Sequence, residues 1–216
     1  MPPPVKPGGK RRLAVLPLAN ISPDPKDEFF SEGLTEELIS ILSKFAGLGV
    51  IARTSVMRYK GTTKSIREIG RELAVGTVLE GSVRRAGNKI RITVQLIDAE
   101  TDEHLWSEVY DRDLEDVFAI QREIALRALR ALKVQIRRAE RTGLDRKPTQ
   151  VAEAYTLYLQ GRVSLSLRTE PSLRQAIDLF QAALARDPNH ALAHTGLAEA
   201  YAILALLEFV PPNEAF

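Results

Sequence analysis

The side chains that most often bind metals or act as acid–base catalysts are scarce in this sequence. It has three histidines and no cysteine in 216 residues, which excludes disulfides, thiolate zinc sites and cysteine catalysis. His190 and His194 stand at a helical i, i+4 spacing, but no third ligand accompanies them, so we interpret both as packing residues. The motifs H-E-x-x-H, H-R-D and D-F-G are missing, and no glycine pattern of a phosphate-binding loop occurs. The sequence therefore predicts no catalytic residue, no metal and no cofactor.

Carboxylates gather in two places, and each has a structural interpretation. Glu28, Glu32 and the pair Glu36–Glu37 fall on one predicted helix, where adjacent side chains point apart, so they predict a solvated face. A second group flanks the predicted strands: Glu80, Asp98, Glu108 and Asp111. We expect this second group to pair with arginines of the same strands. The alternative is a hydrolase or nucleotide-binding site at this acidic edge, which no motif supports.

Charge and composition are those of an ordinary globular chain, with 44% hydrophobic residues, 27% charged residues and a net charge of +2. The basic residues gather in the first 12 residues and between 133 and 147, without the interleaved aromatic side chains of a nucleic-acid surface. We therefore expect no nucleic-acid contact, with a nucleic-acid-binding accessory region of a transcription regulator as the alternative. No apolar stretch approaches the roughly 20 residues of a membrane span. We expect no membrane contact and a cytoplasmic chain, or a periplasmic one if a longer parent carries an anchor.

Residues 12–141 predict an α/β domain with a mixed sheet, after a head at 1–11 whose prolines and glycines indicate disorder. The order of elements is strand, helix, strand, helix, three-strand meander and helix. The expected spans are 12–19, 29–45, 48–56, 66–73, 76–85, 89–99, 104–110 and 114–141. The short helix is the most specific of these predictions, because Ser65 and Glu68 have the spacing of a capping box.

Residues 151–216 predict an all-α segment, after a polar linker at 142–150 that contains Gly143 and Pro148. The expected helices span 151–167, 172–186 and 191–207. Each has apolar residues at three- and four-residue steps, which is typical of an amphipathic helix.

The last two of these helices carry a pattern of small and aromatic residues that resembles a tetratricopeptide repeat (TPR). The matching positions are Ala176, Phe180, Ala183, Pro188, Leu197, Ala198 and Tyr201. Small residues at such positions let antiparallel helices approach, and the aromatic side chains fill the gaps between them. The resemblance implies a protein-binding groove on the first helix of the next repeat. Its residues in this sequence are Leu192, Thr195, Glu199, Ala202 and Ile203.

Only the first helix of that next repeat lies before residue 216. Repeat units bury their cores by stacking, and about three are usually needed for stability. We therefore expect this chain to be a piece of a longer repeat protein. The alternative is a natural end, at which the exposed last helix forms a homo-oligomer with a second copy of the chain.

Residues 12 to about 137 resemble a family of TolB-like amino-terminal domains. The resemblance rests on stretches such as RLAVLPLANIS, DEFFSEGLTEELISIL and IREIGRELAVGTVLEGSVRR. Members of this family often stand between a TPR array and an output domain, such as a class III adenylate cyclase, a serine/threonine kinase or a winged-helix regulator. The family assigns no catalytic residue to this domain. The resemblance therefore implies a sensory or accessory role in bacterial signalling.

Together these patterns favour a non-catalytic sensory and protein-interaction region over an enzyme. The helices are expected to recruit a protein partner, and the α/β domain to sense a ligand or to act as a linker. Any cyclase or kinase activity is then expected to belong to a parent protein, outside this chain.

Overall fold

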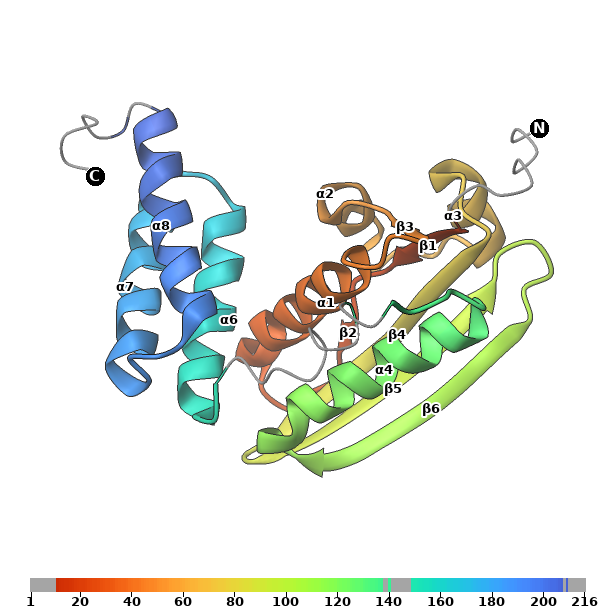
Figure 1. Cartoon of the computed structure of the whole chain (residues 1–216), viewed down its shortest axis with the longest axis horizontal. Coiled ribbons are helices and arrows are strands. Elements are labelled where there is room, and N and C mark those ends of the chain that lie inside the picture. Colours follow the sequence, from red (N-terminus) through yellow and green to blue (C-terminus); the bar gives the residue numbers. More distant parts are fainter. Residues whose placement is uncertain (1–10, 138–139, 141–148, 208, 210–216) are drawn as a thin grey trace. The chain divides into compact units, whose positions relative to one another are not determined.

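The computed structural model describes residues 11–137, 140, 149–207 and 209 (Figure 1). The predicted head, except Arg11, and the predicted linker, except its last two residues, lie outside the described residues. The chain divides into two compact units, Met1–Arg146 and Lys147–Phe216, which are described separately below.

The first unit is built on a six-stranded mixed sheet, which confirms the mixed α/β architecture predicted for this part of the chain. Along the sheet the order is β3-β1-β4-β5-β6, and β2 pairs with β4 beyond the end of β1. The strands are β1 (Arg11–Val15), β2 (Ala19–Asn20), β3 (Leu48–Val50), β4 (Thr77–Ala86), β5 (Lys89–Asp98) and β6 (His104–Asp113). β1, β2, β3 and β4 pair in parallel, whereas β5 and β6 continue the sheet as an antiparallel meander.

Helices cover the two faces of this sheet unequally. α1 (Glu28–Ser43) and α4 (Val117–Ala131) contact each other and lie across one face (Figure 1). They bury the alternate apolar residues of β5, which run from Ile90 to Leu96. α3 (Ile66–Leu73) contacts β4, and its Ser65–Glu68 capping box is present as predicted. The intervening polar residues of β5 point to the opposite face, because side chains alternate along a strand.

The structure corrects two predicted elements of this unit. The strand expected over 48–56 ends at Val50, and a short helix, α2 (Arg53–Val56), with a 3-10 turn over Met57–Tyr59 takes the remaining residues. The helix expected over 114–141 begins with a 3-10 turn and ends at Ala131. Lys133 has a positive φ of 50°, and the Val134 amide donates to the carbonyl of Leu129, which closes the helix end.

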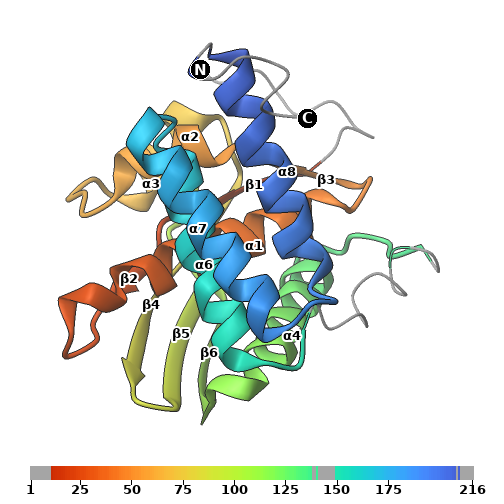
Figure 2. The same cartoon turned by 90° about the vertical axis from the view of Figure 1, so that its left-hand side faces the viewer.

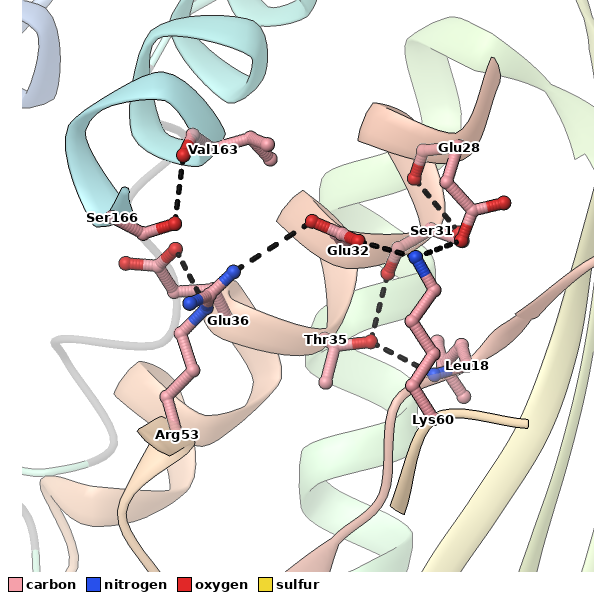
Figure 3. A network of polar contacts seen from close by, with 10 residues as sticks. All are labelled: Leu18, Glu28, Ser31, Glu32, Thr35, Glu36, Arg53, Lys60, Val163 and Ser166. Carbon is pink, nitrogen blue, oxygen red and sulfur yellow. Dashed lines mark hydrogen bonds and ion pairs between the residues drawn. The ribbon is translucent and has the colours of Figure 1, made fainter. Parts of the chain in front are cut away.

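Three carboxylates of α1 form a row of ion pairs with the α2 segment, defined here as residues 53–60 (Figure 3). Arg53 lies 3.4 Å from Glu36 and 3.7 Å from Glu32, while the Lys60 ammonium lies 2.5 Å from Glu32 and 2.8 Å from Glu28. The side chains of Glu32 and Glu36 are only 15% and 12% exposed. The predicted solvated face is therefore wrong for Glu32 and Glu36, which the helical i, i+4 spacing places opposite the two cations, whereas the Glu28 side chain is 39% exposed.

α1 also forms a hydrogen bond with the segment that follows β1, at Leu18 (Figure 3). The buried Thr35 hydroxyl accepts a hydrogen bond from the Leu18 amide at 3.0 Å and donates to the Ser31 carbonyl at 2.8 Å. Since a buried amide without a partner is costly, this contact replaces the ladder bond that Leu18 lacks.

The second unit consists of three helices, α6 (Ala152–Ser166), α7 (Glu170–Arg186) and α8 (Ala191–Leu206), which pack side by side (Figure 2). Helices are observed over the three spans predicted. Thr169 begins α7 with a reciprocal cap, in which its side chain accepts from the Ser172 amide. None of the helices in the described ranges is long and apolar enough to cross a membrane.

The contact between β4 and β5 allows a direct test at Gly81. A Cβ placed on Gly81 would lie 2.0 Å from the carbonyl oxygen of Thr93, and backbone atoms cannot move aside as a flexible side chain can. We expect Gly81→Ala to lower the free energy of unfolding of the first unit by about 2 kcal/mol or more. The measurement is chemical denaturation followed by the fluorescence of Trp106, the only tryptophan in the sequence.

Gly76, just before the same strand, provides the matched control. Its Cβ would meet nothing within 4 Å. We expect Gly76→Ala to change the stability by no more than about 1 kcal/mol. Equal effects of the two substitutions would contradict the close approach at Gly81.

Candidate functional site: a pocket in the α/β unit and a surface on α8

A pocket of about 360 Å³ opens on the sheet face that carries α3. Its wall comes from the chain that follows β1, from the turn after the 3-10 segment, from the start of α3 and from the middle of β4 and β5. The polar side chains that line it are Tyr59, Thr62, Lys64, Glu80, Ser82, Thr93 and Gln95. The apolar ones are Leu16, Pro17, Ala19, Ile66 and Ile69.

The pocket lies where the parallel ladder between β1 and β4 is interrupted. Val15 pairs with Leu79 and Ala19 pairs with Ser82. The three residues 16–18 of the first segment therefore lie opposite only two residues of β4, 80 and 81. Pro17 stands in this gap and has no backbone N–H to donate to a neighbouring strand. The gap follows the carboxyl end of β1, after which the chain continues into β2 beside β4 and then passes through α1 to β3, on the other side of β1. In sheets of this kind, crevices at such a position are the usual place for ligands.

Glu80 is the unusual side chain of this pocket. It is half-buried, and it makes no hydrogen bond or ion pair with any residue that the structure describes. Burial raises the pKa of its carboxyl group above the ordinary value, while the positive charge of His104 acts in the opposite direction and Asp102 adds to the rise. The sequence had suggested an ion pair for Glu80, and the structure shows none.

The other carboxylates of the predicted acidic edge do have partners. Asp111 binds Arg91, as expected for neighbours on paired strands, and Glu108 lies 3.0 Å from Arg127 of α4. Asp98 accepts hydrogen bonds from two backbone amides of the turn that follows it. These residues therefore stabilise the sheet, and Glu80 alone of this group faces the pocket.

One wall of the pocket is held by a small polar cluster around Tyr59. The Tyr59 hydroxyl donates to Glu72 at 2.7 Å and accepts from Arg58 at 2.7 Å. Burial and the hydrogen bond to Glu72 raise the pKa of Tyr59. Lys64 pairs with the same Glu72 carboxylate at 2.5 Å, so its charge is already balanced.

α3 reaches the sheet closely enough to close this wall because of Gly70. A Cβ on Gly70 would lie 2.5 Å from the Cβ of Ala99. The side chain of Ile69 is thereby held at the pocket, where it is 1% exposed.

In the helical unit, the ring of Phe180 is enclosed between two glycines on the neighbouring helices. A Cβ on Gly161 of α6 or on Gly196 of α8 would lie 2.6 Å from the nearest atom of the ring. Phe180 is fully buried, and the ring of Tyr158 lies tilted beside it with the ring centroids 6.1 Å apart. Neither glycine could be found from the repeat pattern, because Gly161 is poorly spaced for its small-residue position and Gly196 does not occupy one.

The residues of the predicted repeat pattern divide into two groups. Ala176, Phe180 and Ala183 of α7 are fully buried, and Pro188 lies exposed in the turn before α8. On α8, Leu197 and Tyr201 are half-buried and Ala198 is exposed. α8 packs instead through Ala193, Gly196, Ala200 and Leu204. The α8 part of the pattern therefore lies outside the core of the described unit.

The predicted groove residues also lie outside that core. Thr195, Glu199 and Ala202 are exposed, and Leu192 and Ile203 are half-buried. Glu199 is engaged by Arg162 of α6 at 3.0 Å. The structure thus brings these five residues together on the outer side of one helix.

His190 is a packing residue. It begins α8, where its Nδ1 accepts a hydrogen bond from the Ala193 amide at 3.3 Å, and its ring lies 5.2 Å from that of Tyr158. Burial lowers its pKa below the ordinary value of 6.5, against the opposite effect of Asp187. Its Nε2 has no hydrogen-bond partner among the described residues. Within those residues there is also no group of three or more His, Asp or Glu side chains that could hold a metal.

The two units define a class of protein: a mixed α/β domain with an open pocket of ligand size, and a separate unit of packed helices with an exposed outer surface. The family model of the HilA/YgeH-like transcriptional regulator, second domain, matches residues 9–127. The chain belongs to this family.

A longer relative extends the similarity through both units. The protein named Putative adenylate cyclase 3, of Rhizobium meliloti (strain 1021), is 44% identical over 209 residues, which cover 97% of this chain and 35% of that protein. The chain therefore spans about a third of the length of that relative.

Solved structures resemble part of the chain only distantly. TolB from Acinetobacter baumannii matches 58% of this chain and 29% of its own, with 12% identity and a TM-score of 0.43. The lipoprotein GNA1162 from Neisseria meningitidis matches 50% of this chain and 81% of its own, with 20% identity and a TM-score of 0.40. The LpoB C-terminal domain from Salmonella enterica matches 48% of this chain and 82% of its own, with 18% identity and a TM-score of 0.39.

Alanine substitutions test the enclosure of Phe180. Alanine is the better helix former by about 1 kcal/mol, so an uncrowded glycine would gain stability on this change. Because the added methyl group would meet the ring, we expect Gly161→Ala and Gly196→Ala each to lower the free energy of unfolding of the helical unit by about 1–3 kcal/mol. The measurement is chemical denaturation followed by helical circular dichroism.

The Phe180→Leu background supplies the control for this test. Leucine leaves room beside the helix backbone, so the penalty of each glycine substitution should shrink in a double-mutant cycle. A penalty of the same size with and without the ring would contradict the contact.

The buried imidazole of His190 predicts a loss of stability in acid. A histidine whose folded-state pKa is lowered contributes full stability above its unfolded pKa, and this stability declines as the pH falls from there through the folded pKa. We expect the helical unit to lose stability below about pH 6.5. In His190→Asn, which keeps a helix-capping side chain, the loss should be smaller. Thermal unfolding between about pH 7.5 and pH 5 measures it, and parallel curves for both proteins would refute the assignment.

Proposed function

We propose that this chain is a non-catalytic region of a signalling or regulatory protein, in which the helical unit binds a protein partner and the α/β unit senses a small ligand. Membership in the family of the HilA/YgeH-like regulator domain supports a regulatory setting. The name of the Rhizobium relative supports a signalling protein whose enzymatic part lies outside the region that this chain matches.

The observation that carries the interaction part is the outer surface of α8. This helix uses one side for the core and leaves outside it a row of side chains that are small or apolar except for the carboxylate Glu199. The row consists of Leu192, Thr195, Glu199, Ala202 and Ile203. A repeat-like arrangement is consistent with the buried small residues of α7, which let the helices pack closely. We therefore propose that the helices are TPR-like and that this surface of α8, the α8 surface, contacts the partner.

The charged residues of the first unit support a protein partner over nucleic acid. Arg91 of β5, Arg112 of β6 and Arg127 of α4 are each paired with a carboxylate. A surface that binds phosphates needs cations that are available to them.

Photo-crosslinking at the α8 surface tests the interaction. A photoreactive residue at Thr195 or Ala202, both exposed, should give a discrete adduct with a partner in cells. The purified partner should then bind the chain, and Thr195→Arg and Ala202→Arg should each weaken binding by about tenfold or more, because a buried unpaired charge at an interface is costly.

Asp178 on α7 is the matched control, since it is also exposed. Asp178→Arg and a photoreactive residue at that position should leave the affinity and the adduct pattern unchanged. Retention of full affinity by both α8 variants would exclude the α8 surface as the binding site.

A further inference from the structure

We propose that the pocket between β1 and β4 binds a small organic cation, an ammonium or guanidinium group on a short carbon skeleton, with Glu80 as its counter-ion. This inference rests on the sensory role proposed above and names the class of ligand. The evidence is the combination of one unpartnered carboxylate, neutral acceptors around it and apolar walls.

The first step is the state of Glu80. Its carboxyl group is half-buried and makes no hydrogen bond or ion pair with the described residues, while other carboxylates of the same sheet are paired. Partial burial of a charge without a partner costs some free energy, so the charged form of this side chain weakens the unliganded fold. A carboxylate without a partner that lines a pocket is a candidate for binding.

The second step is the charge of the lining. Lys64 is the only cationic side chain among the lining residues, and its ammonium group is paired with Glu72 at 2.5 Å. Glu80 therefore sets the electrostatic preference of the interior. An anionic ligand would meet the negative charge of Glu80, whereas a cation would supply the ion pair that Glu80 lacks.

The third step is the chemistry around Glu80. Gln95 is its cross-strand partner, and Ser82 and Thr93 form the next pair on the same face. Their side-chain oxygens can accept the remaining N–H donors of an ammonium or guanidinium group. Leu16 and Ile66 offer apolar surface for a carbon skeleton, which a bare metal ion would not use.

The fourth step is the space itself. At the interruption of the β1–β4 ladder, Leu16 and Pro17 line the opening together with Glu80. The resulting volume of about 360 Å³ lies at the small end of the range for ligand pockets, so it suits a metabolite of a few carbon atoms.

The test uses agmatine, which carries one guanidinium and one ammonium group, and n-butylammonium as probes. The thermal unfolding of the chain is followed by the fluorescence of Trp106, and binding is measured by calorimetry. At a tenfold excess over Kd, we expect the midpoint of unfolding of the first unit to rise by roughly 3–8 °C. Glutarate and sodium chloride at equal ionic strength should produce no such rise.

Glu80→Gln should abolish the effect of the cations, and Glu103→Gln, an exposed carboxylate on the β5–β6 turn, should retain it. Without ligand, Glu80→Gln should also unfold at a higher temperature than the wild type at neutral pH. A raised folded pKa means that the charged form weakens the fold as the pH rises, and the titrating groups around it are Lys64, Tyr59, His104 and Asp102.

An equal rise in the wild type and in Glu80→Gln, or no rise with either cation, would overturn the inference. A negative result in this experiment would exclude only an organic cation as the ligand of the pocket. Partner binding at the α8 surface is measured on different residues, so the outcome of that experiment stands independently.

Discussion

The pairing of β4 on both of its sides is the interaction on which the rest of the α/β unit depends. One side carries β1 and then β2 in parallel, and the other carries β5 over the full length of the strand. Gly81 lets the β5 backbone come within the distance that this pairing needs. Because one ladder is continuous and the other is interrupted at Pro17, β4 presents two residues to an opening instead of to a strand. The pocket thus combines this gap in the strand pairing with the turn after the 3-10 segment and the start of α3.

Local signals predicted the elements, and contacts between distant residues decided where several of them end. The capping box at Ser65 and the alternation along β5 are encoded within a few residues, and both appear as expected. The end of α4 depends on the backbone of Lys133, and the short α2 replaces a strand in a segment whose Arg53 pairs with α1. Neither of these contacts can be read from periodicity.

The residues of the candidate sites could be predicted from the sequence less completely than the helices and strands. The small residues of α7 could be found by their spacing, since they follow a known repeat pattern, but the contacts of Gly161 and Gly196 with Phe180 required three helices to be placed together. Glu80 was noticed as one of four carboxylates near the strands. What distinguishes it, the lack of a partner, is a property of the folded surroundings and has no signal in the sequence. An unpaired charge is found only after its neighbours have been assigned.

The ion pairs between α1 and the α2 segment also affect the pocket, because the α2 segment supplies part of the pocket wall. Arg53 and Lys60 form ion pairs with carboxylates of α1 (Figure 3). Tyr59 and Gly61, the neighbours of Lys60 in the chain, form part of the pocket wall. Dissolved salt screens such pairs where they are exposed, as Lys60 in part is, over a length of about 8 Å at physiological ionic strength. This part of the pocket wall is therefore connected to α1 by ion pairs that weaken as the salt concentration rises.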